Sequence, residues 1–371
     1  MASMRLKMQE LLDLAGIRIN GTRRFDMQIH NERLFQRVIA EGSLGLGESY
    51  MDGWWECEDL EEFFCRVVRA DLDHRVRPLS ELGTYMKAAF LNMQKPSRAF
   101  VIGEHHYDIG DVLYEAMLDR RMIYSCAYWN GTRSLNKAQE QKLDLVFCKL
   151  GLQKGMRVLD IGCGWGGALR YAVEKFGVTG VGVTVSANQA RSARNNCRNL
   201  PVEIHMLDYR DLEGAFDRIW SIGMIEHVGA KNYRTFMKVA RRCLNPGGLF
   251  LLHTIGGNRS VMKCDPWIGK YIFPNSMIPS LRQLSLAWEN IFVLEDLHNI
   301  GPHYTNTLRA WYRNIQRNHA ALSNTYSDRF FRMWRYYLLS CAGAFRARKL
   351  NVWQLVLSPE GVPGGYSPVR M

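Results

Sequence analysis

Residues 158–167 read VLDIGCGWGG, and this stretch constrains the fold of the chain more than any other. Strand-forming residues lead to Asp160, and the glycines that follow allow a tight turn and a close approach of the backbone to a ligand. Residues 168–176 continue with a helical pattern, so the glycines lie between a strand and a helix. This context favours a nucleotide-type cofactor site at the carboxyl end of a strand, with a purely structural turn as the alternative.

Strands and helices alternate after this loop. Ser186 is a suitable N-cap for the polar helix that follows the second strand. Near-continuous apolar strands separated by helices indicate a parallel sheet that is covered on both faces. We therefore expect an α/β fold with a mainly parallel seven-stranded sheet. The further strands are predicted at 178–185, 202–207, 216–223, 247–257, 291–296 and 352–357, and two helices with apolar stripes at 308–315 and 331–345.

The first part of the chain has a different character. Apolar residues around Leu34 recur at helical spacing, so residues 1–93 are predicted to form a smaller, mostly helical domain. The glycine- and aromatic-rich residues 42–55 are expected to form a loop beside a helix. A proline-containing segment at 94–104 has the composition of a linker, and residues 105–371 are expected to form the α/β domain.

The composition limits the class of partner and the compartment. The formal net charge is +12, and the basic excess falls after about residue 105. This indicates an anionic partner, either nucleic acid or phospholipid headgroups, with a merely solvated basic surface as the alternative. No apolar run approaches the roughly 18 residues that cross a bilayer, and no signal peptide is visible. The nine cysteines show no CxxC or metal-like spacing, so we expect free thiols, no metal site and a cytoplasmic protein.

The loop motif also distinguishes between cofactors. A nicotinamide cofactor would favour GxGxxG and an acid after the second strand, whereas this chain has GCGWGG and Thr184. GxGxG preceded by Asp160, with Asp208 and Tyr209 after the third strand, is typical of S-adenosylmethionine-dependent methyltransferases.

Further motifs resemble the cyclopropane-fatty-acyl-phospholipid synthases, and the resemblance covers nearly the whole chain. It includes GLGESYMDGWWE at 45–56, an element of the bacterial phospholipid enzymes that the mycolic-acid relatives lack. The resemblance implies a Rossmann-like class I methyltransferase fold with a helical, lipid-binding N-terminal domain. In order, the motifs are YSCAYW at 124–129, LDIGCGWGG at 159–167, GVTVSANQ at 182–189, GMIEHVG at 223–229, LLHTIG at 251–256 and HNIGPHY at 298–304.

The implied reaction transfers a methylene group from S-adenosylmethionine to the cis double bond of an unsaturated phospholipid acyl chain, which forms a cyclopropane ring. The resemblance places cofactor contacts on the loop, on both sides of it and after the next two strands. The mycolic relatives have Trp-Glu where this chain has Tyr209-Arg210, which puts a role for Arg210 in doubt. The implied cofactor residues are Tyr124 and Ser125 at the methionine end, Asp160, Gly162, Gly164 and Trp165 around the loop, Thr184 and Gln189 near the ribose, and Asp208 and Tyr209 near the adenine.

The chemistry needs a pocket that excludes water and a base that removes one proton from the transferred carbon. The resemblance implies bicarbonate as this proton acceptor. It would be held by Cys126, Glu226, His253 and Tyr304 with the backbone of Ile255. Taken singly, Cys126 could be an ordinary buried thiol, Glu226 a helix-opening residue and His253 a core histidine.

Cys341 lies on the apolar stripe of the last predicted helix. The family's cysteine at this position is a candidate nucleophile, but no basic partner at helical spacing faces Cys341, so we predict that it lines the pocket. Basic residues flank the same stripe and would meet anionic headgroups, with a core helix that has a solvated edge as the alternative. These residues are Arg332, Arg335, Arg346, Arg348 and Lys349.

The expected partners follow from this function. We predict peripheral association with the inner face of the membrane, an unsaturated phospholipid substrate, a homodimer and no nucleic acid partner. The alternatives are another lipid or sterol C-methyltransferase that gives a methyl branch, an RNA methyltransferase, and a non-catalytic lipid-binding protein. The aromatic residues lie at helical core spacing, which disfavours the RNA enzyme.

Overall fold

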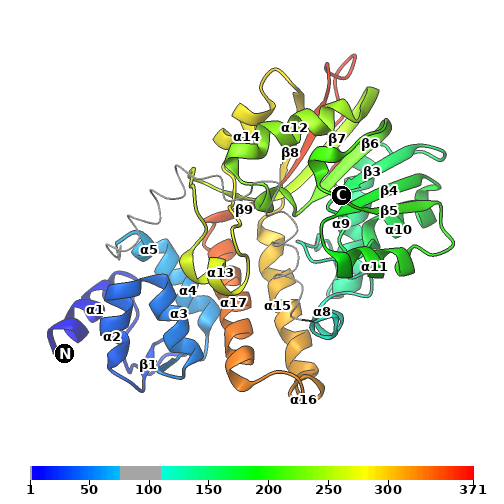
Figure 1. The fold of residues 1–371 in the computed structure, drawn as a ribbon. Helices are drawn as coiled ribbons and strands as arrows, with labels where there is room; N and C mark the ends of the chain where they lie inside the picture. Colours follow the sequence, from blue (N-terminus) through cyan, green and yellow to red (C-terminus); the bar gives the residue numbers. More distant parts are fainter. Residues whose placement is uncertain (1, 76–109) are drawn as a thin grey trace. The chain divides into compact units, whose positions relative to one another are not determined.

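The computed structural model describes residues 2–75 and 110–371, and contacts between Cα atoms group them into two compact units (Figure 1). Each unit combines segments that are far apart in the sequence, whereas the sequence-based division separates one continuous range, 1–93, from another, 105–371. The predicted linker at 94–104 lies outside the described residues. The first unit holds the described part of Met1–Leu91 with Met262–Pro274 and Tyr304–Leu350, and the second holds the described part of Asn92–Val261 with Asn275–His303 and Asn351–Met371.

The second unit is built around a seven-stranded sheet with the order β5-β4-β3-β6-β7-β9-β8. The four pairings among the first five strands of this order are parallel, and β9 pairs antiparallel with β8. The mainly parallel sheet predicted from the apolar runs is therefore confirmed. Its elements are α8 (Asp111–Met117), α9 (Leu135–Lys149), β3 (Arg157–Ile161), α10 (Gly167–Phe176), β4 (Thr179–Thr184), α11 (Ala187–Asn196), β5 (Val202–Met206), η2 (Tyr209–Asp211), β6 (Phe216–Ile222), η3 (Ile225–His227), η4 (Ala230–Asn232), α12 (Tyr233–Arg242), β7 (Leu244–Gly257), α14 (Leu281–Trp288), β8 (Val293–Asn299) and β9 (Leu350–Ser358).

Both faces of this sheet are covered, because successive side chains of a strand point to opposite sides. On one face, Val158, Trp220 and Leu251 pack with apolar residues of α9, α10 and α11. On the other face, Leu159 and Phe250 pack with residues of α12 and α14. The chain runs from β3 outward to β5 and then returns to β6 on the other side of β3, which makes a switch point between β3 and β6. Ligands bind outside the carboxyl ends of the strands at such a point.

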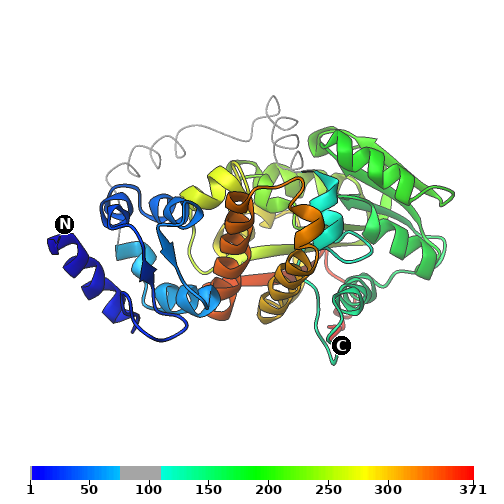
Figure 2. The same ribbon diagram turned by 90° about the horizontal axis from the view of Figure 1, so that it is seen from below.

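The first unit is mostly helical. Its long helix α17 (orange) lies beside α3 and α4 in both views (Figures 1 and 2). None of the helices within 2–75 and 110–371 is both long and apolar enough to cross a membrane. The elements are α1 (Ala2–Leu14), β1 (Gln28–Ile29), α2 (Arg33–Glu41), α3 (Ser43–Met51), β2 (Trp55–Glu56), α4 (Leu60–Arg69), α5 (Leu72–Arg75), α13 (Pro266–Tyr271), α15 (Pro302–Arg317, from Tyr304 onward in this unit), α16 (His319–Leu322) and α17 (Asp328–Arg346).

The glycine-rich residues 42–55 form a helix over most of their length, so the predicted loop is wrong. Two of these glycines lie within helix α3, where they allow close packing against neighbouring helices and do not form a turn. A Cβ atom on Gly45 would lie 2.5 Å from the carbonyl oxygen of Arg37, and one on Gly47 would lie 2.3 Å from the ring of Trp267. Glycine therefore allows α3 to pack against α2 and α13.

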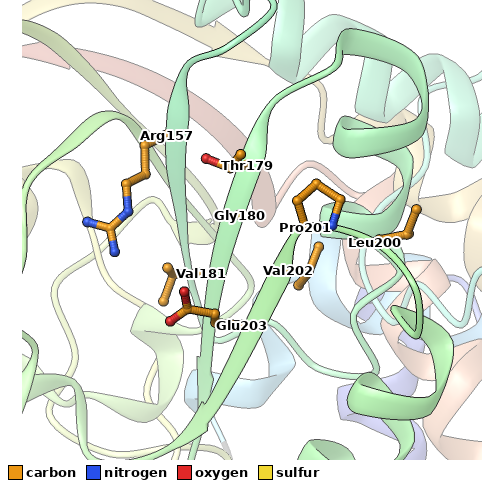
Figure 3. A pocket seen from close by; sticks show the side chains of 8 residues that line it. All are labelled: Arg157, Thr179, Gly180, Val181, Leu200, Pro201, Val202 and Glu203. Carbon is orange, nitrogen blue, oxygen red and sulfur yellow. The ribbon is translucent and has the colours of Figure 1, made fainter.

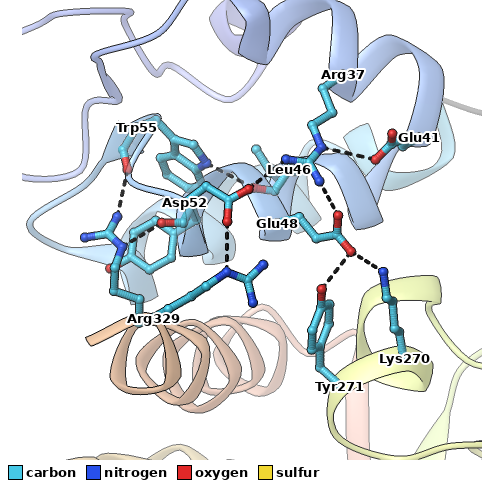
Figure 4. Close-up of polar contacts among 11 residues, drawn as sticks. Arg37, Glu41, Leu46, Glu48, Asp52, Trp55, Lys270, Tyr271 and Arg329 are labelled. Atoms are coloured by element: carbon cyan, nitrogen blue, oxygen red, sulfur yellow. Dashed lines mark hydrogen bonds and ion pairs between the residues drawn. The ribbon is translucent and has the colours of Figure 1, made fainter. Parts of the chain in front are cut away.

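Ion pairs connect the segments of the first unit (Figure 4). The buried carboxylate of Glu48 on α3 pairs with Arg37 of α2 and with Lys270 of α13, over 2.6 Å for the lysine, and it accepts a hydrogen bond from Tyr271. Asp52 pairs with Arg37 and with Arg329 of α17. These contacts lower the pKa of both carboxyl groups against the effect of burial.

Candidate active site

The glycine loop connects β3 to α10 as the sequence predicts. Gly162, Gly164 and Gly166 all have positive φ angles, and the backbone N–H groups of Gly162 and Cys163 donate to the carbonyl oxygen of Val183 in β4. A Cβ atom on Gly164 would meet no other atom within 4 Å. The backbone at Gly164 is therefore open to a ligand.

Asp160 lies at the carboxyl end of β3, just before the loop. Its side chain is buried, and its Oδ1 atom has no hydrogen-bond partner within the described part of the chain. Burial raises the pKa of this carboxyl to about 7. A buried polar atom without a partner costs free energy, so a donor from a ligand would be favourable here.

The predicted ribose and adenine residues also lie at the carboxyl ends of their strands. At the end of β4, the Thr184 hydroxyl donates to Gln189 Oε1 over 2.9 Å, and both side chains are buried. After β5, both carboxylate oxygens of Asp208 accept hydrogen bonds from Arg210, whose guanidinium also lies 4.8 Å from the centre of the Tyr209 ring. Arg210, whose role the sequence left in doubt, therefore orients Asp208 and Tyr209.

The segment that carries Tyr124 and Ser125 lies beside the same strand ends. The Ser125 Cβ atom is 3.9 Å from the position of a Cβ atom on Gly223, which follows β6. The rings of Tyr124 and Trp165 each lie about 5 Å from the ring of Tyr114, at 5.3 and 5.1 Å between centroids. Tyr114 therefore connects the predicted methionine-end residues to the glycine loop.

A buried lysine that the sequence analysis missed contacts this segment. Lys142 on α9 is completely buried, and its Nζ donates to Ser125 Oγ over 3.0 Å. Burial lowers the pKa of Lys142 to about 8, against the opposing effect of Asp119, Cys126 and Asp160. One signal in the sequence could have identified it, namely a lysine on the apolar face of an amphipathic helix.

Three of the predicted proton-acceptor residues lie together at the ends of β6 and β7. The backbone N–H of Ile255 donates to Glu226 Oε1 over 2.7 Å, and the carbonyl of His253 accepts from the N–H of Gly223. Glu226 Oε2 is buried without a hydrogen-bond partner among residues 2–75 and 110–371. Burial raises the pKa of Glu226 to about 6. Cys126 is buried next to Ser125, and its thiol donates to the Ala127 carbonyl oxygen.

His253 is held in the neutral form. Burial, together with the nearby cations Lys142 and Lys149, lowers its pKa well below the usual value. Its Nδ1 lies 3.3 Å from Nε2 of Gln354, a fully buried residue of β9 that the sequence analysis also missed. A single glutamine in an otherwise apolar strand is the signal that could have revealed it.

Tyr304 and Cys341 belong to the first unit. The Tyr304 ring is buried and packs 4.6 Å from the Phe345 ring and 5.8 Å from the Trp311 ring. Burial raises the pKa of the Cys341 thiol to about 12, so it is protonated at neutral pH. This favours a lining role over a nucleophilic one, because the thiolate is the nucleophile.

The basic residues on the flanks of α17 mostly have acidic partners within the first unit. Arg332 pairs with Glu56, Arg346 with Glu61 at 2.8 Å, and Lys349 with Asp71. Arg335 donates to the hydroxyl of Tyr50 and to backbone carbonyls. These contacts favour a packed helix with a partnered edge over a headgroup-binding one.

A pocket of about 470 Å³ lies at the other end of the sheet (Figure 3). It is lined by residues at the amino ends of β3, β4 and β5, including Arg157, Thr179 and Val202, and by Leu200, Pro201 and Glu203. Because these strands are parallel, this end is opposite to the glycine loop. The pocket contains none of the predicted site residues.

The fold and the strand-end residues together define a class of enzyme. A parallel sheet with a glycine loop after β3, an open backbone at Gly164 and an unpartnered buried carboxyl oxygen on Asp160 fit an S-adenosyl cofactor. The second unit is therefore a class I S-adenosylmethionine-dependent methyltransferase fold. The residues fit as a set, since Asp160, Thr184 and Asp208 lie at the carboxyl ends of three adjacent parallel strands.

Comparison with known proteins narrows this class. The family model for mycolic acid cyclopropane synthetase matches residues 94–355. The cyclopropane-fatty-acyl-phospholipid synthase of Escherichia coli (strain K12) is 49% identical over 362 residues, which span 97% of this chain and 94% of that protein. The tuberculostearic acid methyltransferase UfaA1 of Mycobacterium tuberculosis (strain H37Rv) is 30% identical over 90% of this chain and 82% of that protein.

A solved structure agrees with these relatives. Mycolic acid cyclopropane synthase CmaA1, complexed with SAH and CTAB, superposes with a TM-score of 0.65 at 33% identity and covers 70% of this chain and 97% of that one. The chain thus belongs to the cyclopropane-fatty-acyl-phospholipid synthase family, and it is an enzyme of the S-adenosylmethionine-dependent methyltransferase class.

Proposed function

We propose that the protein adds a methylene group across the cis double bond of an unsaturated acyl chain of a phospholipid and so forms a cyclopropane ring. When bound, S-adenosylmethionine supplies an electrophilic methyl group on a sulfonium sulfur. One C–S bond breaks, two C–C bonds form in place of the C=C π bond, and one proton leaves the transferred carbon. The names of the E. coli relative and of the matched family support the substrate class.

The proton must be removed in a site without water, since water would trap a cationic intermediate. The residues at the ends of β6 and β7 are suited to this task, because Glu226 and His253 are both buried, and Cys126 of the segment between α8 and α9 is buried as well. We propose that they hold a bicarbonate ion, which would supply the proton acceptor. His253 is neutral and offers one ring nitrogen, while the Glu226 carboxyl is oriented by Ile255 N–H.

One observation carries this proposal. Glu226 Oε1 is fixed by a 2.7 Å hydrogen bond, while Oε2 of the same buried carboxyl has no partner among the described residues. A donor from a small bound species would satisfy it, and an acid near neutrality is suited to proton transfer. Tyr304 and Cys341 stay predictions from the sequence.

Access to the substrate requires contact with a bilayer. We propose peripheral binding at the inner face of the membrane, a cytoplasmic location and a homodimer. The basic balance of the chain, at +12, supports attraction to anionic lipid. Vesicle flotation at low and high ionic strength tests this, and binding that does not weaken with salt would contradict the electrostatic part.

The reaction is tested with labelled S-adenosylmethionine and vesicles of unsaturated phosphatidylethanolamine. We expect a gain of one CH₂ per modified acyl chain and proton NMR signals of a ring methylene. The 30% identical relative named tuberculostearic acid methyltransferase UfaA1 makes a methylated acyl chain without a ring, either methyl-branched or exomethylene, the second candidate product. An exomethylene product would show alkene signals, a saturated methyl branch would show a methyl doublet, and neither would show ring-methylene signals.

The role of bicarbonate is tested in the same assay. Buffers stripped of carbon dioxide should lower kcat, and added bicarbonate should restore it. Glu226→Gln should remove this response and still bind S-adenosylhomocysteine. Full activity without bicarbonate would contradict the proposed acceptor, whereas no CH₂ gain under any condition would overturn the proposed reaction itself.

A further inference from the structure

A lysine with no exposed surface lies against the segment predicted to hold the methionine end of the cofactor. Lys142 is 0% exposed, on a helix face that also buries Leu145 and Val146. Burying an ammonium group costs free energy, and apolar side chains of similar volume often replace buried charges without loss of stability. The charge at Lys142 therefore indicates a function and not a contribution to packing.

The donor and the acceptor of the hydrogen bond between Lys142 and Ser125 can be assigned from the groups involved. An ammonium group has only donors, so the Ser125 hydroxyl oxygen must accept the 3.0 Å hydrogen bond from Lys142. The single proton of that hydroxyl then points away from the lysine. Ser125 is thereby prepared as a donor toward a further acceptor.

Hydrogen bonds from buried side chains also fix the backbone of the segment that carries Ser125. Gln139, one turn before Lys142 on α9 and fully buried, donates from Nε2 to the carbonyl oxygen of Ser125 over 2.9 Å and to that of Ile123 over 3.3 Å. Asp119 accepts hydrogen bonds from the N–H groups of Ile123 and Arg121, at 2.8 and 3.1 Å. The position of the Ser125 hydroxyl is therefore determined by buried contacts on both sides.

We propose that Lys142 is a positioning residue for the cofactor, which holds the Ser125 hydroxyl as a hydrogen-bond donor to the carboxylate of an α-amino acid group. In S-adenosylmethionine this group is the methionine carboxylate. The inference rests on the proposed function through the predicted placement of Ser125 at the methionine end. Lys142 acts through Ser125, so its effect should appear in cofactor affinity and depend on the carboxylate.

The test measures binding of S-adenosylhomocysteine by isothermal titration calorimetry. Lys142→Met should weaken binding about tenfold or more, since a charge-assisted hydrogen-bond network is lost. Lys149 gives a matched control, because it lies on the same helix, is also buried and pairs with Asp296 at 3.3 Å. Lys149→Met should reduce thermal stability and leave the affinity unchanged.

Three further measurements distinguish a positioning role of Lys142 from a structural one. In a Ser125→Ala background, Lys142→Met should cause no additional loss of affinity. Decarboxylated S-adenosylmethionine, which lacks the carboxylate, should bind to the wild type and to Lys142→Met equally well. Lys142→Gln, which keeps an N–H donor, should bind S-adenosylhomocysteine more tightly than Lys142→Met, and it carries the test if the methionine variant does not fold.

The results of these measurements distinguish a positioning role of Lys142 from a purely structural one. Wild-type affinity in folded Lys142→Met, an equal loss for the decarboxylated ligand, or a full additional loss in the Ser125→Ala background would each overturn the positioning role. If the wild-type protein itself does not bind S-adenosylhomocysteine, the proposed function fails and not this inference alone.

Discussion

Two glycines of the cofactor loop, three residues apart, should respond differently to the same substitution. A Cβ atom on Gly164 would meet nothing within 4 Å, whereas one on Gly167 would lie 1.9 Å from the carbonyl oxygen of Arg121. Gly164 has a φ of +53°, a left-handed conformation that costs an alanine about 1 kcal/mol. Gly164→Ala should therefore remain folded, with its new methyl group in the space that a ligand would fill.

The expected magnitudes differ clearly. Gly164→Ala should lower Tm by about 2–4 °C, the shift that about 1 kcal/mol produces in a unit of this size. Gly167→Ala forces two backbone segments apart, which costs about 3 kcal/mol and should lower Tm by about 6–12 °C. Cofactor affinity should fall about tenfold in Gly164→Ala, because the backbone can no longer approach the ligand closely.

Differential scanning calorimetry measures the first effect, and calorimetric titration with S-adenosylhomocysteine measures the second. The two variants serve as controls for each other, since they share the loop and the chemical change. Wild-type affinity in Gly164→Ala would refute the placement of the cofactor against this loop. A Gly167→Ala protein as stable as the wild type would refute the contact with Arg121.

Three further predictions concern charge and reactivity. The pKa of Glu226 is raised from 4.5 to about 6 in the folded state, so the folded state binds this proton more tightly than the unfolded state. Ionisation of Glu226 therefore lowers the free energy of unfolding. This loss is absent below about pH 4.5 and complete above pH 6, where it reaches about 2 kcal/mol. Urea unfolding should therefore show that Glu226→Gln gains stability over the wild type as the pH rises from 4.5 to 7, and a constant difference would contradict the buried carboxylate. Glu48→Ala should lower the free energy of unfolding by about 1–2 kcal/mol, because a buried carboxylate with three partners is lost. Glu32 forms an exposed ion pair with Arg5, so the control variant Glu32→Ala should have no measurable effect on thermal unfolding. Iodoacetamide at pH 8 should label the exposed Cys148 before Cys341. The pKa of Cys341 is about 12, so roughly one thiol in ten thousand is ionised at this pH. Mass spectrometry of the peptides would show the opposite order of labelling if Cys341 were an activated nucleophile.

The sheet could be predicted from the sequence because its strands are apolar runs of the right length, separated by helices. The interpretation of residues 42–55 was wrong because glycine serves two purposes, and only the neighbours of Gly45 and Gly47 show that close packing is the relevant one. Lys142 and Gln354 were missed for a related reason. A single polar residue on an apolar face gives no indication of its partner until the fold brings that partner beside it.

The buried carboxyl of Glu226 would also limit which anion the proposed site could accept. Its Oε2 atom lacks a hydrogen-bond partner among the described residues, so the proposed anion would bind best if it offered a donor, because two unprotonated anions in contact would repel each other. Bicarbonate carries one O–H group and can donate to Oε2 while its remaining oxygens accept, whereas nitrate or acetate can only accept. A carboxylate with a pKa of about 6 can relay a proton, whereas His253, which burial holds in the neutral form, keeps its protonation state. In the proposed mechanism, the acceptor would therefore arrive with a hydroxyl group that donates to Glu226 and would leave with the abstracted proton.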